Sequence, residues 1–169
     1  LPPRDMLRHL PFFEALAAIE EGTPLWRATT AGLGVLRLID AATTEGPAWT
    51  DANRWSIHAA RTAAEAMDPA PARTVLLGLV ELVAEGGASE TDLLVARLFA
   101  YARTLDLDGR YDLAADVYTS VVSLADPALQ GDVIIDAYMR LGYCHRMVGR
   151  FDDATVAYAV ARQLAGAAG

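Results

Sequence analysis

Hydrophobic residues recur along this chain at steps of three and four positions. Between residues 23 and 42, for example, they fall at Leu33, Leu36 and Ile39. Such spacing lines one face of an α-helix. Runs of alternating β-branched residues between turn dipeptides, which would predict strands, are nearly absent from the sequence. The pattern therefore predicts an all-α protein.

Proline and glycine interrupt this helical pattern and set the predicted helix ends. Proline suits the first turn of a helix, whereas glycine suits the left-handed backbone position that follows the last turn. The eight predicted helices cover residues 4–21, 24–45, 50–67, 70–85, 90–107, 111–125, 128–148 and 151–166. Because their connections are short, we expect sequential helices to pack antiparallel as hairpins of roughly 40 residues.

The last two predicted hairpins repeat each other. A shift of 40 residues brings Gly109 onto Gly149. The other pairs that match in this register are Arg110 and Arg150, Tyr111 and Phe151, Ala114 and Ala154, Tyr118 and Tyr158, Val121 and Ala161, and Leu124 and Leu164. Small residues let two helices approach closely, and aromatic residues fill the space between neighbouring hairpins. We therefore interpret the spacing as a packing pattern, with Gly142 and Ala154 at close helix contacts.

This pattern resembles the tetratricopeptide repeat, a helical hairpin with an aromatic residue and a Leu-Gly pair in its first half and alanine and aromatic positions in its second. The matching residues are Tyr138, Leu141, Gly142, Gly149, Phe151, Ala154, Tyr158 and Ala161, and the earlier copy retains Gly109, Tyr111, Ala114 and Tyr118. The resemblance covers about residues 90–166. Two features depart from the family: the period is 40 residues rather than about 34, and His145 stands where an aromatic residue is usual.

The resemblance implies a right-handed, tetratricopeptide-like α-solenoid of antiparallel hairpins, about eight helices in all. Residues 87–169 would form two such repeats. Residues 1–86 carry no full set of the landmarks, so we interpret them as degenerate repeats or an N-terminal helical cap. We expect the two parts to pack as one continuous domain.

Proteins of this family typically bind peptide segments or helices in a concave groove lined by the first helix of each hairpin. The family's groove positions correspond here to Phe99, Arg103, Asp106, Leu107, Asp136, Met139, Tyr143, Arg146 and Met147. This surface combines apolar and methionine side chains with two arginines, which suits a short amphipathic segment carrying an acidic residue. The resemblance therefore implies a scaffold for protein–protein interaction. An N-terminal helix of the same chain or a second copy is the alternative occupant of the groove.

Charge and composition narrow the class of partner. The chain carries 14 basic residues, all of them arginine, against 22 acidic residues, for a formal net charge of −8. This balance repels a phosphate backbone, so we expect no nucleic-acid partner. No apolar run approaches the roughly 18 residues that a membrane span requires, so we expect no membrane partner. The alanine and arginine bias of the composition suggests a module of a larger bacterial protein.

The single cysteine, Cys144, excludes an internal disulfide and fits a reducing compartment. The first residues also lack the pattern of a signal peptide, so we expect a soluble, cytoplasmic protein. Apolar residues make up 53% of the chain and lie on more than one face of the last predicted helix. We therefore expect a homodimer, or a contact with a segment outside this sequence, through the C-terminal hairpin.

Candidate chemistry is sparse. The histidines, His9, His58 and His145, stand far apart, without the spacing of a metal site. Cys144 directly precedes His145, but adjacent helical residues point about 100° apart and are poorly placed to share a proton. We interpret Cys144 as a small buried residue and His145 as a packed ring.

Tryptophan and paired glycines also have packing interpretations. We expect Trp26, Trp49 and Trp55 to be core anchors or lids, and Gly32 and Gly34 to allow close helix contact. No cluster of titratable residues emerges, so we predict a protein that is not an enzyme and that has no metal or cofactor. A small-molecule sensor, a regulatory domain or an enzyme with a pocket between hairpins is the alternative.

Overall fold

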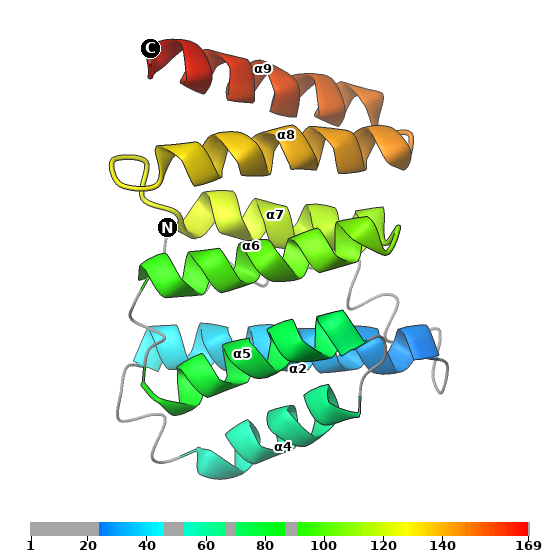
Figure 1. The fold of residues 1–169 in the computed structure, drawn as a ribbon, viewed down its shortest axis with the longest axis vertical. Helices are drawn as coiled ribbons and strands as arrows, with labels where there is room; N and C mark the ends of the chain where they lie inside the picture. Colours follow the sequence, from blue (N-terminus) through cyan, green and yellow to red (C-terminus); the bar gives the residue numbers. More distant parts are fainter. Residues whose placement is uncertain (1–23, 46–52, 67–69, 87–90, 169) are drawn as a thin grey trace. The chain divides into compact units, whose positions relative to one another are not determined.

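The structure, a computed structural model, describes residues 24–45, 53–66, 70–86 and 91–168 (Figure 1). The helices are α2 (Pro24–Glu45), α4 (Arg54–Glu65), α5 (Ala70–Ala84), α6 (Thr91–Leu107), α7 (Tyr111–Leu124), α8 (Gly131–Met147) and α9 (Phe151–Ala167). These described residues contain no strand, which confirms the all-α prediction. The helix expected over residues 4–21 lies outside the described residues.

Most predicted helix ends agree with the structure to within one residue, and the larger differences are at both ends of α4 and at the start of α8. This helix begins at Gly131, three residues after the predicted start at residue 128. The preceding segment forms a turn instead: the backbone N–H of Gln130 donates to the Asp126 carbonyl at 2.7 Å, and that of Ala128 donates to the Asp126 carboxylate at 2.9 Å. Such local side-chain hydrogen bonds compete with helix formation.

The chain divides into two compact units, Leu1–Arg97 and Leu98–Gly169. In the first unit, α2, α4 and α5 pack on one another. Their core contains the periodic residues of the sequence, including Leu36, Ile39, Leu76, Leu79, Val80 and Val83, all fully buried. The three- and four-residue spacing therefore identifies the buried faces of α2 and α5.

Two packing expectations in the first unit are wrong. Trp55 is 73% exposed, because the buried face of α4 is formed by Ile57, Ala60 and Ala64, and a residue two positions before Ile57 points to the opposite side of the helix. Gly34 is exposed, and a Cβ atom added there would meet nothing within 4 Å. The side chains of the other two tryptophans lie outside the described residues.

In the second unit, α8 lies between α7 and α9, and each of these helices runs antiparallel to the one before it (Figure 1). The largest buried side chains of this unit are Tyr101 and Tyr118, which have almost no exposed surface. They are accompanied by buried Leu98, Leu105, Leu113, Val117 and Val121. The antiparallel packing expected from the short connections is present in this part of the chain.

The turns that precede α7 and α9 have the same backbone geometry, 40 residues apart. Gly109 and Gly149 have φ angles of 76° and 81°, the left-handed conformation that glycine adopts readily. The arginine after each glycine donates its backbone N–H to the carbonyl five residues earlier, at 2.9 Å in both turns. This is the hydrogen bond that closes a Schellman motif at a helix end. The repeat detected in the sequence is therefore also a repeat of the backbone.

The close helix contact expected at Gly142 is confirmed, and Ala154 is buried. A Cβ atom added to Gly142 of α8 would lie 2.7 Å from the Tyr158 ring of α9, so only glycine fits without a shift of that ring. Ala154 is buried, and so is its counterpart in the earlier repeat, Ala114. Small side chains therefore set the distance between neighbouring helices.

Candidate functional site

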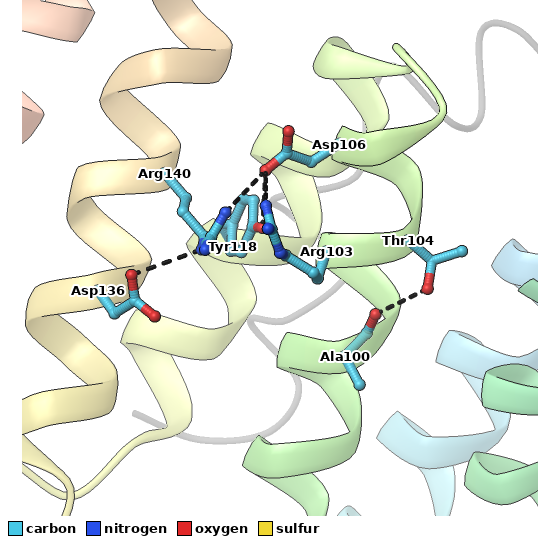
Figure 2. A network of polar contacts seen from close by, with 7 residues as sticks. All are labelled: Ala100, Arg103, Thr104, Asp106, Tyr118, Asp136 and Arg140. Carbon is cyan, nitrogen blue, oxygen red and sulfur yellow. Dashed lines mark hydrogen bonds and ion pairs between the residues drawn. The ribbon is translucent and has the colours of Figure 1, made fainter. Parts of the chain in front are cut away.

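The expected groove residues on α6 include a buried carboxylate, Asp106, which is only 7% exposed (Figure 2). Its Oδ2 atom accepts a hydrogen bond from the Tyr118 hydroxyl at 3.1 Å. The same oxygen lies 3.5 Å from Nη1 of Arg140 and 3.6 Å from Nη1 of Arg103. Two guanidinium groups and a hydroxyl therefore compensate the buried charge, and the contacts join α6, α7 and α8.

Arg140 extends this network across the surface of α8. Its guanidinium carbon lies 5.9 Å from the centre of the Phe99 ring, within the range of a cation–π contact. Its Nε atom lies 3.5 Å from the carboxylate of Asp136, one helical turn earlier. Phe99 also meets the Tyr118 ring edge-on, with centroids 5.6 Å apart. Asp106 is thus buried and Phe99 half-buried in this network, and Asp136 lies at its exposed end.

An apolar stripe on α8 is exposed. Met139, Tyr143 and Met147 are between 42% and 48% exposed and follow one another at four-residue spacing, which places them on one face of the helix. Arg146 is exposed beside Met147. The structure thus brings four of the expected groove residues together, and we call this group of Met139, Tyr143, Arg146 and Met147 the α8 stripe.

Two expected groove residues on α6 differ in their surroundings. Leu107, the last residue of α6, is 71% exposed. Arg103 is half-buried, and its guanidinium pairs with Asp106. An arginine engaged in this way offers less of its charge to a ligand than the exposed Arg146 does.

Tyr143 is oriented by a neighbouring ring. It meets Tyr111 at the start of α7 edge-on, with centroids 5.8 Å apart and an interplanar angle of 80°. Hydrogen bonding to Tyr143 raises the pKa of Tyr111. Edge-to-face pairs of this kind stabilise a defined ring orientation, so one side of Tyr143 is packed while the other faces solvent.

Three residues of this region are not among the expected groove residues: Arg140, Tyr118 and Tyr111. The sequence pattern assigns both tyrosines to the packing of the repeat and gives Arg140 no role. For Arg140, the four-residue spacing from Asp136 is a visible signal of an ion pair on a helix. Its contact with Asp106, 34 residues earlier in the chain, depends on how α6 and α8 pack. No local pattern in the sequence predicts that contact.

The cysteine and histidine on α8 do not form a catalytic pair. Cys144 is fully buried, as expected, and its burial raises the pKa of the thiol to about 12. Burial lowers the pKa of the neighbouring His145. At neutral pH the thiol is therefore protonated and shielded from solvent, unlike a reactive cysteine.

Two open hollows flank α8 and α9. The larger, of about 510 Å³, is mostly apolar and lies between the C-terminal end of α7, the start of α8 and the end of α9. Its lining includes Val122, Pro127, Ile135, Tyr138, Val160 and Leu164. The smaller, of about 430 Å³, is lined by Met139, Thr155, Tyr158, Ala159 and Arg162. Both hollows lie within the second unit.

Over the described ranges, no three His, Cys, Asp or Glu side chains gather in the way a metal ion requires. Of the helices in the described part of the chain, none combines the length and apolarity needed to cross a bilayer. No family model, no curated protein and no solved structure matches this chain.

Proposed function

We propose that this chain is a tetratricopeptide-like scaffold whose hairpins stack as a right-handed α-solenoid, and that it binds a peptide or partner helix across α6 and α8. It serves protein–protein interaction rather than catalysis, within a larger bacterial protein of the cytoplasm. The observation that carries this proposal is the α8 stripe, in which two methionines and a tyrosine are exposed beside Arg146.

The composition of the α8 stripe supports binding. Aromatic residues, methionine and arginine are the types enriched at protein interfaces. Methionine adapts to the shape of an apolar partner, because its side chain is unbranched and polarisable. The exposed guanidinium of Arg146 favours a ligand with a carboxylate beside its apolar face.

The packing beneath the α8 stripe supports binding as well. Tyr143 is oriented by Tyr111, and α8 is tied to α6 by the contact between Arg140 and Asp106. A surface that is already ordered loses less conformational entropy when it binds a ligand. The stripe is therefore suited to an amphipathic helix with apolar residues at four-residue spacing.

A small-molecule sensor is the second candidate, because the larger hollow has a volume of about 510 Å³. This size falls within the ~300–1,000 Å³ usual for ligand pockets. The lining of Val122, Ile135, Tyr138 and Leu164 fits an apolar compound. Such a ligand would raise the thermal stability of the chain, and Ile135→Asp would abolish that rise without affecting peptide binding at the α8 stripe.

Selection of helical peptides from a displayed library on the immobilised chain tests the main proposal. We expect Tyr143→Ala and Arg146→Ala each to weaken binding of a selected peptide by about tenfold in fluorescence anisotropy, equivalent to about 1.4 kcal/mol. Asp153→Ala on α9 is the control, and circular dichroism verifies that each variant is folded. Binding that survives both α8 variants would place the interaction elsewhere.

A further inference from the structure

In the second unit, α8 covers a surface of α7 by specific contacts. Tyr143 of α8 meets Tyr111 of α7 edge-on. Arg150, at the end of the turn after α8, forms an ion pair with Asp112 of α7, with an Nη2–Oδ1 distance of 2.8 Å. Tyr118 of α7 is fully buried. The antiparallel helix α8 therefore covers this surface of α7.

The surface of α9 that corresponds to this surface of α7, 40 residues later in the sequence, is exposed. Phe151 stands 40 residues after Tyr111 and is 65% exposed. The next residue, Asp152, is exposed too. Tyr158 is only partly buried, whereas its counterpart Tyr118 is inaccessible to solvent. Aromatic and acidic groups that make contacts on α7 thus face solvent on α9.

The charges on α9 define what can cover it. Asp152 puts negative charge in the first turn of the helix, and Arg162 puts positive charge ten residues later, at the edge of the smaller hollow. Ten residues correspond to about 15 Å along a helix. A covering helix must therefore carry a cation opposite Asp152 and an anion opposite Arg162. For α7, the cation opposite Asp112 is Arg150, which lies in the turn after α8.

A second α9 meets this requirement when it runs antiparallel to the first. Its Arg162 then approaches Asp152, and its Asp152 approaches Arg162, whereas a parallel arrangement would bring like charges together. Thr155 and Ala159 lie between the two charged positions and are exposed. Because these side chains are small, two helices can approach closely there.

We infer that the exposed face of α9, formed by Phe151, Asp152, Thr155, Ala159 and Arg162, binds the same face of a second copy of this chain. We call this surface the α9 face. The two α9 helices lie antiparallel about a twofold axis, so that each ion pair occurs twice. The α9 face adjoins the α8 stripe at the smaller hollow, which Met139 lines together with Thr155, Ala159 and Arg162. The ion pairs of this contact nevertheless involve no residue of the stripe.

Reciprocal charge reversal tests this inference, with sedimentation equilibrium as the measurement. We expect Asp152→Arg and Arg162→Asp, each alone, to raise the dimer dissociation constant at least about tenfold, because each brings like charges together. An equimolar mixture of the two variants restores opposite charges at both positions. Its dissociation constant should return to within about threefold of the unmodified value.

Asp153→Arg is the matched control, because it makes the same charge change in the same turn of α9. Asp153 lies two residues before Thr155, about 200° around the helix and so nearly opposite the α9 face, and its variant should dimerise normally. A monomeric mass at every concentration would overturn the inference. The inference would also be overturned if neither single reversal raised the dimer dissociation constant. It would be overturned as well if the mixture of the two variants did not associate. Circular dichroism of each variant verifies folding.

Discussion

At the scale of single residues, the absence of a side chain at Gly142 determines how closely α8 and α9 pack. An added Cβ atom would lie 2.7 Å from the Tyr158 ring, so Gly142→Ala should displace that ring and destabilise the chain by about 1–3 kcal/mol. Gly131→Ala, in the same helix, is the control, because nothing lies within 4 Å of its added Cβ. The midpoint of urea denaturation measures the stability of each variant. Equal midpoints for the two variants would contradict the packing described for α8 and α9.

Burial of Cys144 makes the stability of the folded chain depend on pH. Its thiol has a pKa of about 12 in the folded chain, above the value of about 8.5 for an exposed thiol. The neutral thiol therefore contributes stability in full below about pH 8.5, and this contribution is lost as the pH rises toward 12. At pH 8 a thiol-specific reagent should modify the native chain at least about a hundredfold more slowly than the chain in urea. Rapid modification of the native chain would show that Cys144 is accessible.

At the scale of helices, the Asp106 carboxylate joins three of them. Asp106→Ala would leave Arg140 and the Tyr118 hydroxyl without their shared acceptor (Figure 2). We expect a loss of about 1–3 kcal/mol in the free energy of unfolding. Asp136→Ala is the matched control, because that carboxylate is exposed and its loss should change stability by less than about 0.5 kcal/mol. Similar losses for both variants in urea denaturation would argue against a buried network.

Helix positions could largely be predicted from the sequence, because local chemistry determines them. Gly109 and Gly149 adopt the left-handed conformation that ends a helix, and both turns were predicted. The start of α8 was missed, because the side chain of Asp126 makes hydrogen bonds that favour a turn. Trp55 was wrongly placed, since the buried face of a short alanine-rich helix is poorly defined by its few large apolar residues.

The candidate site was less predictable than the helices. Four-residue spacing indicates that Met139, Tyr143 and Met147 share a face of α8, and their exposure in the structure agrees with a surface position. The burial of Asp106 could not be predicted in the same way. Its partner Arg140 lies 34 residues away in the sequence, and only the packing of α6 against α8 brings the two together.

At the scale of the whole molecule, the chain combines a formal net charge of −8 with 53% hydrophobic residues. The α8 stripe is a place where apolar side chains and a positive charge are exposed together. An acidic amphipathic helix would be repelled by the net charge at long range and attracted by Arg146 at short range. We therefore expect added salt to weaken the repulsion between the molecules and to leave the apolar contacts in place.

Chemical-shift mapping gives the most direct test of the central claim, that the α8 stripe binds a peptide helix. A selected peptide is titrated into the isotopically labelled full chain, and the amide shifts are followed residue by residue. We predict that the largest changes fall at Met139, Tyr143, Arg146 and Met147. Changes confined to Val122, Ile135 and Leu164, which line the larger hollow, would contradict the claim, as would the absence of any saturable change.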